Sequence, residues 1–335
     1  MLLRSIISRL IAVAITLFGV AVVVFTLIRV APGNPIAMML PPGATAADIA
    51  RLEALYGFDK SLPEQFVIWL KAVAQGDFGT SIIMRQPVAE LVLERLPATL
   101  ELALMALLLA VALGGLGAVV GARFRGRSPE LGVDLGVGVG LSVPDFLWGL
   151  LLILLFGVLW PVLQISGRVD PRLAVDLSTN FYIIEGLLRG QWRLVQDVLA
   201  HMLMPALALS LPLAAMIAQV LKQSLKAELH LDYTQLARVR GLSETRVIVS
   251  EALRNAALPT LTLIGVQFTF LIGGTVIVER LFAYEGLGNM AIEAVINRDL
   301  PLIQGIVLLF ALLFIVINLA VDLTYGLLNP RLRHG

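Results

Sequence analysis

The sequence predicts an all-α protein that crosses a membrane six times. Of its 335 residues, 58% are hydrophobic and only 15% are charged, which is typical of a polytopic membrane protein. Six apolar runs approach the roughly 20 residues that cross a bilayer core of about 30 Å as a helix. The period-two alternation of a membrane β-barrel is absent. The runs are 9–29, 98–122, 132–158, 200–221, 259–281 and 301–327.

The first run is expected to remain as a transmembrane helix. Arg4 and Arg9 precede apolar residues from Leu10 to Ile28, a stretch longer than the roughly 7–15 residues of a signal-peptide core. The sequence "RVAPGNP" follows, without an obvious A-x-A cleavage site.

The loop at 30–97 carries two further helical patterns. Apolar residues recur at helical spacing in "AADIARLEALYGF" and in "PEQFVIWLKAV", and "GDFGTS" is typical of a turn. One interpretation is that these helices rest on the outer membrane surface, with Trp69 as an interfacial anchor. The other is that they form a docking rim for an external partner.

Basic residues predict the orientation of the spans. Arg123, Arg125 and Arg127 occupy a very short link, the loop at 222–258 is basic, and the chain ends in "NPRLRHG". Because cytoplasmic loops carry an excess of Lys and Arg, these segments are expected in the cytoplasm, together with both termini. The predicted organisation is a cytoplasmic N-terminus with the first span (1–29), a periplasmic helical loop (30–97) and a five-helix core (98–335) that contains the loop 222–258.

Several kinds of chemistry lack a signal in the sequence. There is no Gly-Lys pair and hence no P-loop, and there is no cysteine. The three histidines are scattered without metal-ligand spacing, and no Ser-His-Asp set or other active site is visible. The net charge of +1 gives no reason to expect nucleic acid. Gly132, Gly136, Gly138 and Gly140 are interpreted as close helix packing.

The polar stretch "QLARVRGLSETRVIVSEALRNAALP" (235–259) lies between two apolar runs. Gly241 is expected to end a short basic helix, with Ser243 as the N-cap of the next. In that second helix Ile248, Ala252 and Ala256 share one face, whereas Arg246, Ser250 and Arg254 share another. Pro259 marks the entry into the following span. The pattern predicts a helix–turn–helix at the cytoplasmic surface; a basic amphipathic connector lying on anionic lipid is the alternative.

This stretch resembles the cytoplasmic EAA loop of ABC-transporter permeases, in particular the B-type subunits of dipeptide and oligopeptide importers. The matching residues are Asp232, Tyr233, Ala237, Arg238, Gly241, Leu242, Arg246, Val247, Ala252, Leu253, Arg254, Asn255, Ala256, Leu258 and Pro259. The resemblance continues along nearly the whole chain, through "PGNP" (32–35), "YGFDKSLPEQF" (56–66), "GDFGTS" (76–81), "RLPATLEL" (95–102), "SVPDFLWG" (142–149), "GLG" (286–288) and "VDLTYGLLNPRLR" (321–333).

The resemblance implies a type I importer permease in the bacterial inner membrane, which forms half of a translocation pathway and is not itself an enzyme. The implied partners are a second, related permease, two cytoplasmic ATPase subunits that hold ATP and magnesium, and a periplasmic or lipid-anchored substrate-binding protein. No cofactor is expected in this chain. The residues implied to couple it to the ATPase are Gln235, Ala237, Arg238, Gly241, Leu242, Arg246, Leu253, Arg254 and Asn255.

The sequence also departs from the family pattern. Gln235 and Leu236 stand where the general motif has Glu-Ala, and Glu251 replaces a common histidine. Relatives of this branch carry peptides, glutathione or chelated nickel, so the substrate stays open. A secondary transporter or channel is the rival class, although no convincing internal repeat supports it.

"SVPDFLWG" contributes three candidate residues of the pathway: Ser142, Pro144 and Asp145. Pro144 is expected to break the third helix, and Asp145 stands where the family commonly has an apolar residue. A carboxylate inside a bilayer is unfavourable by roughly 2.5–3.5 kcal/mol on insertion scales, so it is expected to face the bundle interior or water. Asp145 would then either pair with a polar group of the partner permease or meet the positive end of a substrate.

Overall fold

The computed structural model describes residues 2–30, 45, 59–173, 175 and 177–328. Secondary structure in this part of the chain is helical, apart from one isolated bridge between Thr80 and Pro87. The predicted all-α fold is therefore confirmed. The helix expected in "AADIARLEALYGF" lies outside the described residues.

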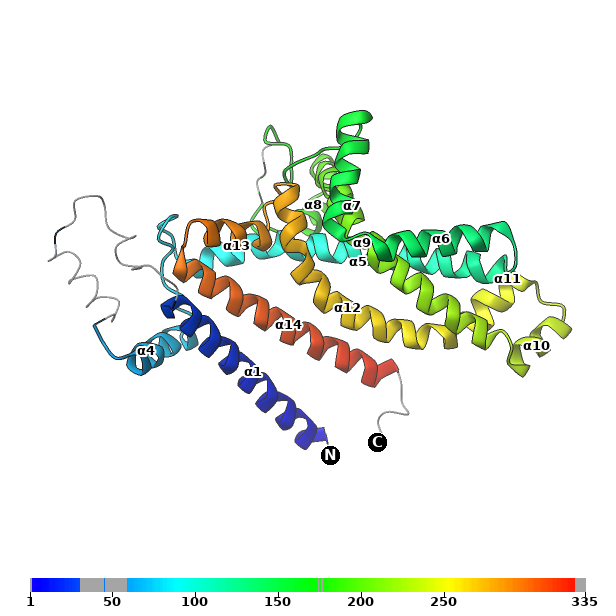
Figure 1. Ribbon diagram of the computed structural model, residues 1–335, viewed down its shortest axis with the longest axis horizontal. Helices are drawn as coiled ribbons and strands as arrows, with labels where there is room; N and C mark the ends of the chain where they lie inside the picture. Colours follow the sequence, from blue (N-terminus) through cyan, green and yellow to red (C-terminus); the bar gives the residue numbers. More distant parts are fainter. Residues whose placement is uncertain (1, 31–44, 46–58, 174, 176, 329–335) are drawn as a thin grey trace. The chain divides into compact units, whose positions relative to one another are not determined.

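Figure 1 shows the helices in chain order. They are α1 (Leu2–Val30), α4 (Leu62–Ala74), α5 (Val88–Arg123), α6 (Ser128–Ser142), α7 (Asp145–Leu152), η1 (Ile153–Leu159), α8 (Tyr182–Leu188), α9 (Trp192–Glu228), α10 (Asp232–Val239), α11 (Glu244–Arg246), η2 (Val247–Ala252), α12 (Leu253–Leu281), α13 (Leu287–Ile296) and α14 (Leu300–Leu328).

Four of the expected spans are single helices long and apolar enough to cross a membrane. They are α5, α9, the continuous run Glu244–Leu281 and the Leu300–Val321 part of α14. The first expected span coincides with α1, whose stretch Ile11–Thr26 is a shorter apolar helix. The third expected span, 132–158, corresponds to a pair of helices. These two helices, Ser128–Ser142 and Asp145–Leu159, meet at an angle of 107°. The helix breaks at Pro144 as expected, because proline lacks the N–H that would continue the ladder.

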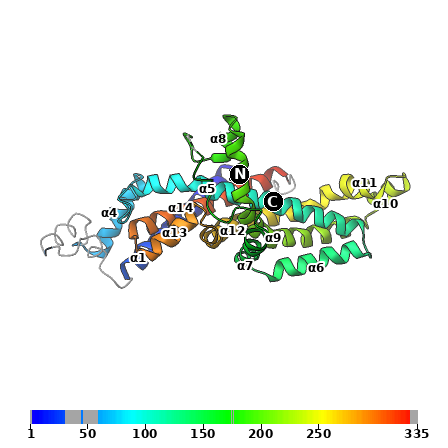
Figure 2. The ribbon, with the colours of Figure 1, turned by 90° about the horizontal axis from the view of Figure 1, so that it is seen from above.

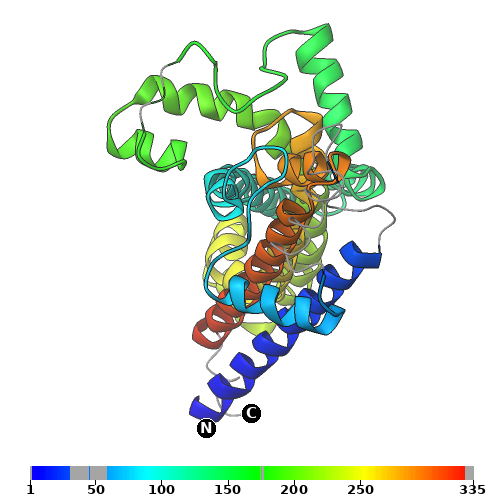
Figure 3. The same ribbon diagram turned by 90° about the vertical axis from the view of Figure 1, so that its left-hand side faces the viewer.

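The chain divides into two compact units. Unit 1 contains residues 1–94 and 290–316, and unit 2 contains residues 95–289 and 317–335. In unit 1, α4 lies across α1 (Figure 3), and the Phe66 ring packs edge-on against Phe25 at 5.2 Å between centroids. The expected turn in "GDFGTS" is present, since Gly76 and Gly79 have φ of +84° and +82°.

In unit 2, α9 is the central helix. It carries a long series of buried residues and packs against α6, α7, α8 and α12 (Figure 2). Gly140 allows the α6–α9 approach, since a Cβ at this position would lie 2.7 Å from the Cβ of Ala215. Gly132, Gly136 and Gly138 make no such approach within the part of the chain that the structure describes, because a Cβ on each would meet nothing there within 4 Å.

A buried glutamate explains the "GLG" motif. The Glu279 side chain accepts hydrogen bonds from Thr99 Oγ1 at 2.7 Å and from the backbone N–H of Gly288 at 2.7 Å, so it caps the start of α13. A Cβ on Gly286 would lie 2.3 Å from Glu279 Oε2, and one on Gly288 would lie 2.4 Å from Val276 Cα. Only glycine lets the chain wrap this closely around the carboxylate.

Candidate functional site

The segment 232–258 forms two helices that meet at a sharp turn. α10 ends in a Schellman motif: the N–H of Leu242 bonds to the carbonyl of Ala237, and the N–H of Gly241 to that of Arg238. Gly241 adopts the left-handed conformation that this motif requires, with φ of +80°. Ser243 is extended at the N-cap position of α11, as expected, but its side chain makes no capping hydrogen bond. The predicted helix–turn–helix is confirmed.

The second helix of the segment is continuous with the following span. α11 passes through the π-helical turn η2 into α12, and the run extends from Glu244 to Leu281. Pro259 lies within α12 and does not end it. A displacement of the segment is therefore expected to be transmitted along the α12 axis. Short π-helical turns are often found at functional sites.

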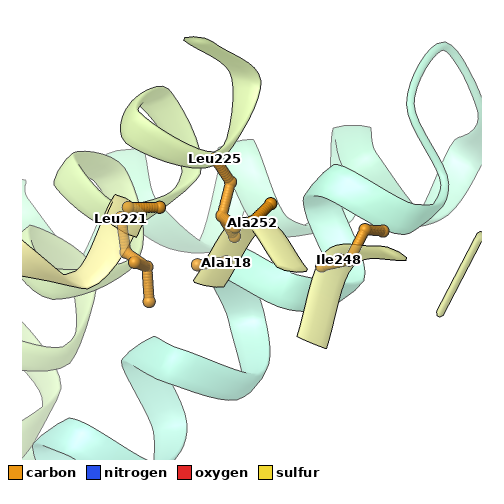
Figure 4. Close-up of a cluster of buried hydrophobic side chains, with 6 residues drawn as sticks. Ala118, Leu221, Leu225, Ile248 and Ala252 are labelled. Atoms are coloured by element: carbon orange, nitrogen blue, oxygen red, sulfur yellow. The ribbon is translucent and has the colours of Figure 1, made fainter. Parts of the chain in front are cut away.

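The inner face of this helix packs against two other helices, α5 and α9. Ile248, Ala252 and Ala256 are fully buried, as their i, i+4 spacing predicts, and they pack against Ala118 of α5 and two leucines of α9, Leu221 and Leu225 (Figure 4). The apolar cluster joins η2 and the start of α12 to α5 and α9. These four elements are expected to move as one body, because packed interiors transmit displacement.

Ion pairs and hydrogen bonds brace the turn internally. The Arg238 guanidinium donates to both carboxylate oxygens of Glu244, at 2.9 and 2.7 Å, and to the carbonyl of Leu229 at 3.0 Å. Tyr233 donates to Glu228 at the end of α9 and accepts from Asn255 Nδ2 at 3.2 Å. The two hydrogen bonds from the Arg238 guanidinium to Glu244 thus bridge the turn at Gly241.

The outer face of the segment carries exposed arginines. Arg246 and Arg254 are both exposed, as is Ser250 between them. The structure shows no ion pair for either arginine among the described residues. Val249 beside them is 47% exposed, so the face combines charge with apolar surface.

The candidate coupling residues therefore separate into two groups. Ala237 is buried, Leu253 packs on the apolar cluster, and Arg238 and Asn255 are held by internal bonds, as is Gln235 through the Leu229 carbonyl at 3.2 Å. Gly241, Leu242, Arg246 and Arg254 lie at the turn or on the outer face.

Sequence reasoning missed Glu244 and the α9 leucines. Opposite charges on either side of Gly241 were a signal for the Arg238–Glu244 pair. The i, i+4 pair Leu221 and Leu225, just before the loop, was a signal for the inner contact.

A second polar feature lies at the helix break. Ser142 ends α6 with its Oγ bonded to the Gly138 carbonyl at 2.7 Å, Pro144 precedes α7, and Asp145 begins it. Asp145 Oδ1 accepts from the N–H of Phe146 at 2.7 Å, and Oδ2 faces Gly274 of α12, where a Cβ would be 3.3 Å away. No cation of the described residues pairs with this half-buried carboxylate.

A buried ion pair fixes the loop between η1 and α8. Arg168 donates to Glu101 Oε2 at 2.8 Å, both side chains are 5% exposed, and the guanidinium lies 3.7 Å from the centre of the Tyr182 ring. Glu101 Oε1 also accepts from the N–H of Ile183 at 2.9 Å. Arg168 in the loop and Ile183 at the start of α8 are thereby both bonded to Glu101 of α5.

Glu185 organises the same loop through hydrogen bonds. It accepts from the Thr179 hydroxyl and from the N–H and hydroxyl of Ser178, the latter two at 2.8 Å. The Thr179 hydroxyl first, and then the Ser178 N–H and hydroxyl, lower the pKa of Glu185 from 4.5 to about 2 despite its burial.

The order of this loop is expected to depend on pH. A lowered pKa means that the stabilisation is fully present above about pH 4.5 and is lost as the pH falls towards 2. Amide hydrogen exchange of Ser178 and Thr179, corrected for intrinsic rates, should show this loss of protection. Glu185→Gln should remove the pH dependence, whereas Glu90→Gln on the exposed surface of α5 should keep it. If the amide exchange of Glu185→Gln depended on pH as it does in the wild type, Glu185 would not be the group that orders the loop.

Comparison with known proteins matches nearly the whole chain. Residues 110–334 match the family described as binding-protein-dependent transport system inner membrane component, and residues 2–103 match the N-terminal region of such components.

Relatives are similar over nearly their full lengths. The di/tripeptide transport system permease protein DppB of Pseudomonas aeruginosa is 39% identical, over 95% of each chain. The dipeptide transport system permease protein DppB of Escherichia coli K12 is 38% identical, over 99% of each. The glutathione transport system permease protein GsiC of Salmonella paratyphi A is 36% identical, over 99% of this chain and all of the relative.

Proposed function

Since this chain belongs to the family of binding-protein-dependent transport system inner membrane components, we propose that it is the transmembrane subunit of an ATP-driven importer of di- and oligopeptides. Relatives at 38–39% identity that are named as dipeptide and di/tripeptide permeases support peptides as the substrate class. The relative named as a glutathione permease, at 36%, makes glutathione the second candidate.

The observation that carries the proposal is the two-faced helix of the segment 232–258. Its inner face is packed onto α5 and α9, and its outer face exposes Arg246 and Arg254. A partner that grips the outer face and moves would displace three helices at once. This is what coupling to an ATPase requires.

The complex has further parts. ATP and magnesium bind to two ATPase subunits at the cytoplasmic side, a second related permease completes the pathway, and a periplasmic or lipid-anchored protein delivers the substrate. Both termini, the link 124–127 and the segment 232–258 lie in the cytoplasm, which the arginines of the link support.

The break between α6 and α7 lines the pathway in this proposal. Ser142, Pro144 and Asp145 lie where a transmembrane helix is interrupted, and broken helices commonly surround substrate sites in transporters. Asp145 supplies a negative charge there.

Charge reversal on the outer face tests the coupling role. Arg246→Glu and Arg254→Glu should each weaken binding of the ATPase subunits, measured by co-purification and titration, by tenfold or more, or about 1.4 kcal/mol. Membrane insertion should be unchanged. Arg172→Glu is the control, because this side chain is 93% exposed in the loop between η1 and α8, far from the segment in sequence.

Wild-type ATPase binding by both single variants would contradict a docking role and favour contact with lipid phosphate instead. Uptake by the reconstituted complex, with dipeptides and glutathione in competition, separates the two substrate classes. An uptake that proceeds without any ATPase would contradict the function itself.

A further inference from the structure

The helix α6 is held to the rest of unit 2 by little apolar surface. Gly140, in its last turn, is the one residue of α6 that is buried within the part of the chain that the structure describes. Leu131, Leu135 and Val139 are each more than half exposed. The first half of α6 therefore needs contacts of another kind to stay on its neighbours.

Lys222 of α9 supplies these contacts. Its ammonium group forms ion pairs with Glu130, at 3.3 Å, and with Asp134, two carboxylates that lie one turn apart on α6. The side chains of Lys222 and Glu130 are only 19% and 25% exposed. We call these three residues the Lys222 cluster. Removal of one partner from a shielded ion pair leaves a charge without compensation, so the cluster joins α6 to α9 strongly.

A glycine of α5 makes room for the lysine. A Cβ on Gly121 would lie 2.7 Å from Lys222 Cδ and 3.6 Å from Cγ1 of Val133 in α6. The aliphatic part of Lys222 thus passes directly over the α5 backbone on its way to α6. Residues of α5, α6 and α9 meet at this point.

The cluster is also connected to the segment 232–258. Glu130 accepts a hydrogen bond from the N–H of Gly126, in the link between α5 and α6, at 2.6 Å. Arg123, where α5 ends, donates to Thr245 Oγ1 of α11 at 3.3 Å (Figure 1). The link therefore contacts the segment at one end and the Lys222 cluster at the other.

We propose that Lys222 is the positioning residue that makes α6 follow the segment 232–258. The apolar cluster already joins η2 and α12 to α5 and α9, and the Lys222 cluster adds α6 to this body. α6 ends at Ser142, beside the helix break, so a displacement received on the outer face of the segment reaches the break through α6. The consequence for transport rests on the proposed function, whereas the attachment of α6 is a property of this chain alone.

A distance measurement tests the attachment. Since the chain contains no cysteine, spin labels can be placed at Leu135→Cys in α6 and Val239→Cys in α10, positions that are 62% and 83% exposed. The distance distribution is recorded by electron paramagnetic resonance in the assembled complex with cysteine-free partner subunits, first without nucleotide and then with ATP and vanadate. The wild type should keep the same mean distance in both states. Lys222→Met should at least double the width of the distribution.

Two further substitutions control this measurement. Lys222→Arg keeps the charge and should restore the narrow distribution. Lys226→Met removes a lysine from an exposed position one turn further along α9 and should leave the distribution unchanged.

The ratio of peptide uptake to ATP hydrolysed provides the functional readout. Lys222→Met should lower this ratio at least fivefold, while ATP hydrolysis and co-purification of the ATPase subunits stay within twofold of the wild type. A merely structural defect would lower uptake and hydrolysis together. Absence of peptide uptake by the wild-type complex would count against the proposed function, but the distance measurement needs no substrate and still decides the role of Lys222.

A second variant keeps the test decisive if Lys222→Met fails to fold. Glu130→Gln combined with Asp134→Asn removes both negative charges, keeps the lysine, and should have the same effects as Lys222→Met. A wild-type distance that changes between the two nucleotide states as much as in these variants would overturn the inference. So would a wild-type ratio of uptake to hydrolysis, or equal losses of uptake and hydrolysis, in both of them.

Discussion

Gly241→Val is expected to abolish transport while leaving a folded, inserted protein. Gly241 has a φ of +80°, and a Cβ there would meet nothing within 4 Å among the described residues, so valine causes no clash with them. The penalty is backbone strain alone, roughly 1–2 kcal/mol for an L-residue and more for a β-branched one. Relief of the strain requires a negative φ, which undoes the Schellman motif and redirects α11 away from the Arg238–Glu244 pair.

Gly76 provides a matched control. It follows α4 in the same Schellman motif, with a φ of +84° and the same open space around a Cβ. Gly76→Val therefore carries equal strain at a position outside the coupling segment. Uptake and substrate-stimulated ATP hydrolysis should fall at least tenfold in Gly241→Val, and much less in Gly76→Val.

Gly241→Asn should retain most activity, because asparagine tolerates the left-handed conformation. Equal losses in the two valine variants would reveal a general folding defect, and wild-type uptake by Gly241→Val would remove the turn from the coupling mechanism.

The sequence predicted those parts of the fold that depend on local periodicity. Apolar runs located the spans, and the positions of Gly241, Ile248, Ala252 and Ala256 predicted the turn and the buried face of the segment. These features follow from the 3.6-residue repeat and from the conformational freedom of glycine, which a single sequence displays.

Features that depend on pairing between distant residues were not predictable in this way. The bond between Thr99 and Glu279 joins residues 180 positions apart, and Arg168 reaches Glu101 over 67 positions. Neither partner's type or local pattern identifies the other. The "GLG" motif was visible, but its reason, the close approach of Gly286 to Glu279, required the folded chain.

The candidate site illustrates the same limit within one segment. The family resemblance placed Arg238 and Asn255 among the coupling residues together with Arg246 and Arg254. Only the geometry shows that the first two are bonded within the chain and the last two are exposed. Helical periodicity gives the face of a residue but not the identity of its neighbour.

Asp145 carries a half-buried carboxylate at a break between two helices. Glu101 forms an ion pair with Arg168, and Asp134 forms one with Lys222. No cation of the described residues pairs with Asp145, which begins α7 at the 107° break. A carboxylate within a membrane protein is generally paired or faces a water-filled path. In the proposed importer the missing cation is supplied either by the neighbouring permease or by the α-ammonium group of a peptide.

Asp145→Asn distinguishes these sources, because the amide keeps the size and hydrogen bonding of the side chain and removes its charge. If the substrate supplies the cation, uptake of peptides with a free α-amine should fall roughly 10- to 100-fold, in line with the 1.5–3 kcal/mol of a hydrogen bond to a charged group. Uptake of N-acetylated peptides, assembly of the complex and peptide affinity of the binding protein should stay unchanged. Asp145→Glu should restore most of the uptake, since it restores the charge. Loss of assembly with Asn would instead assign the cation to the neighbouring permease, and unchanged uptake of every peptide would exclude Asp145 as a substrate contact.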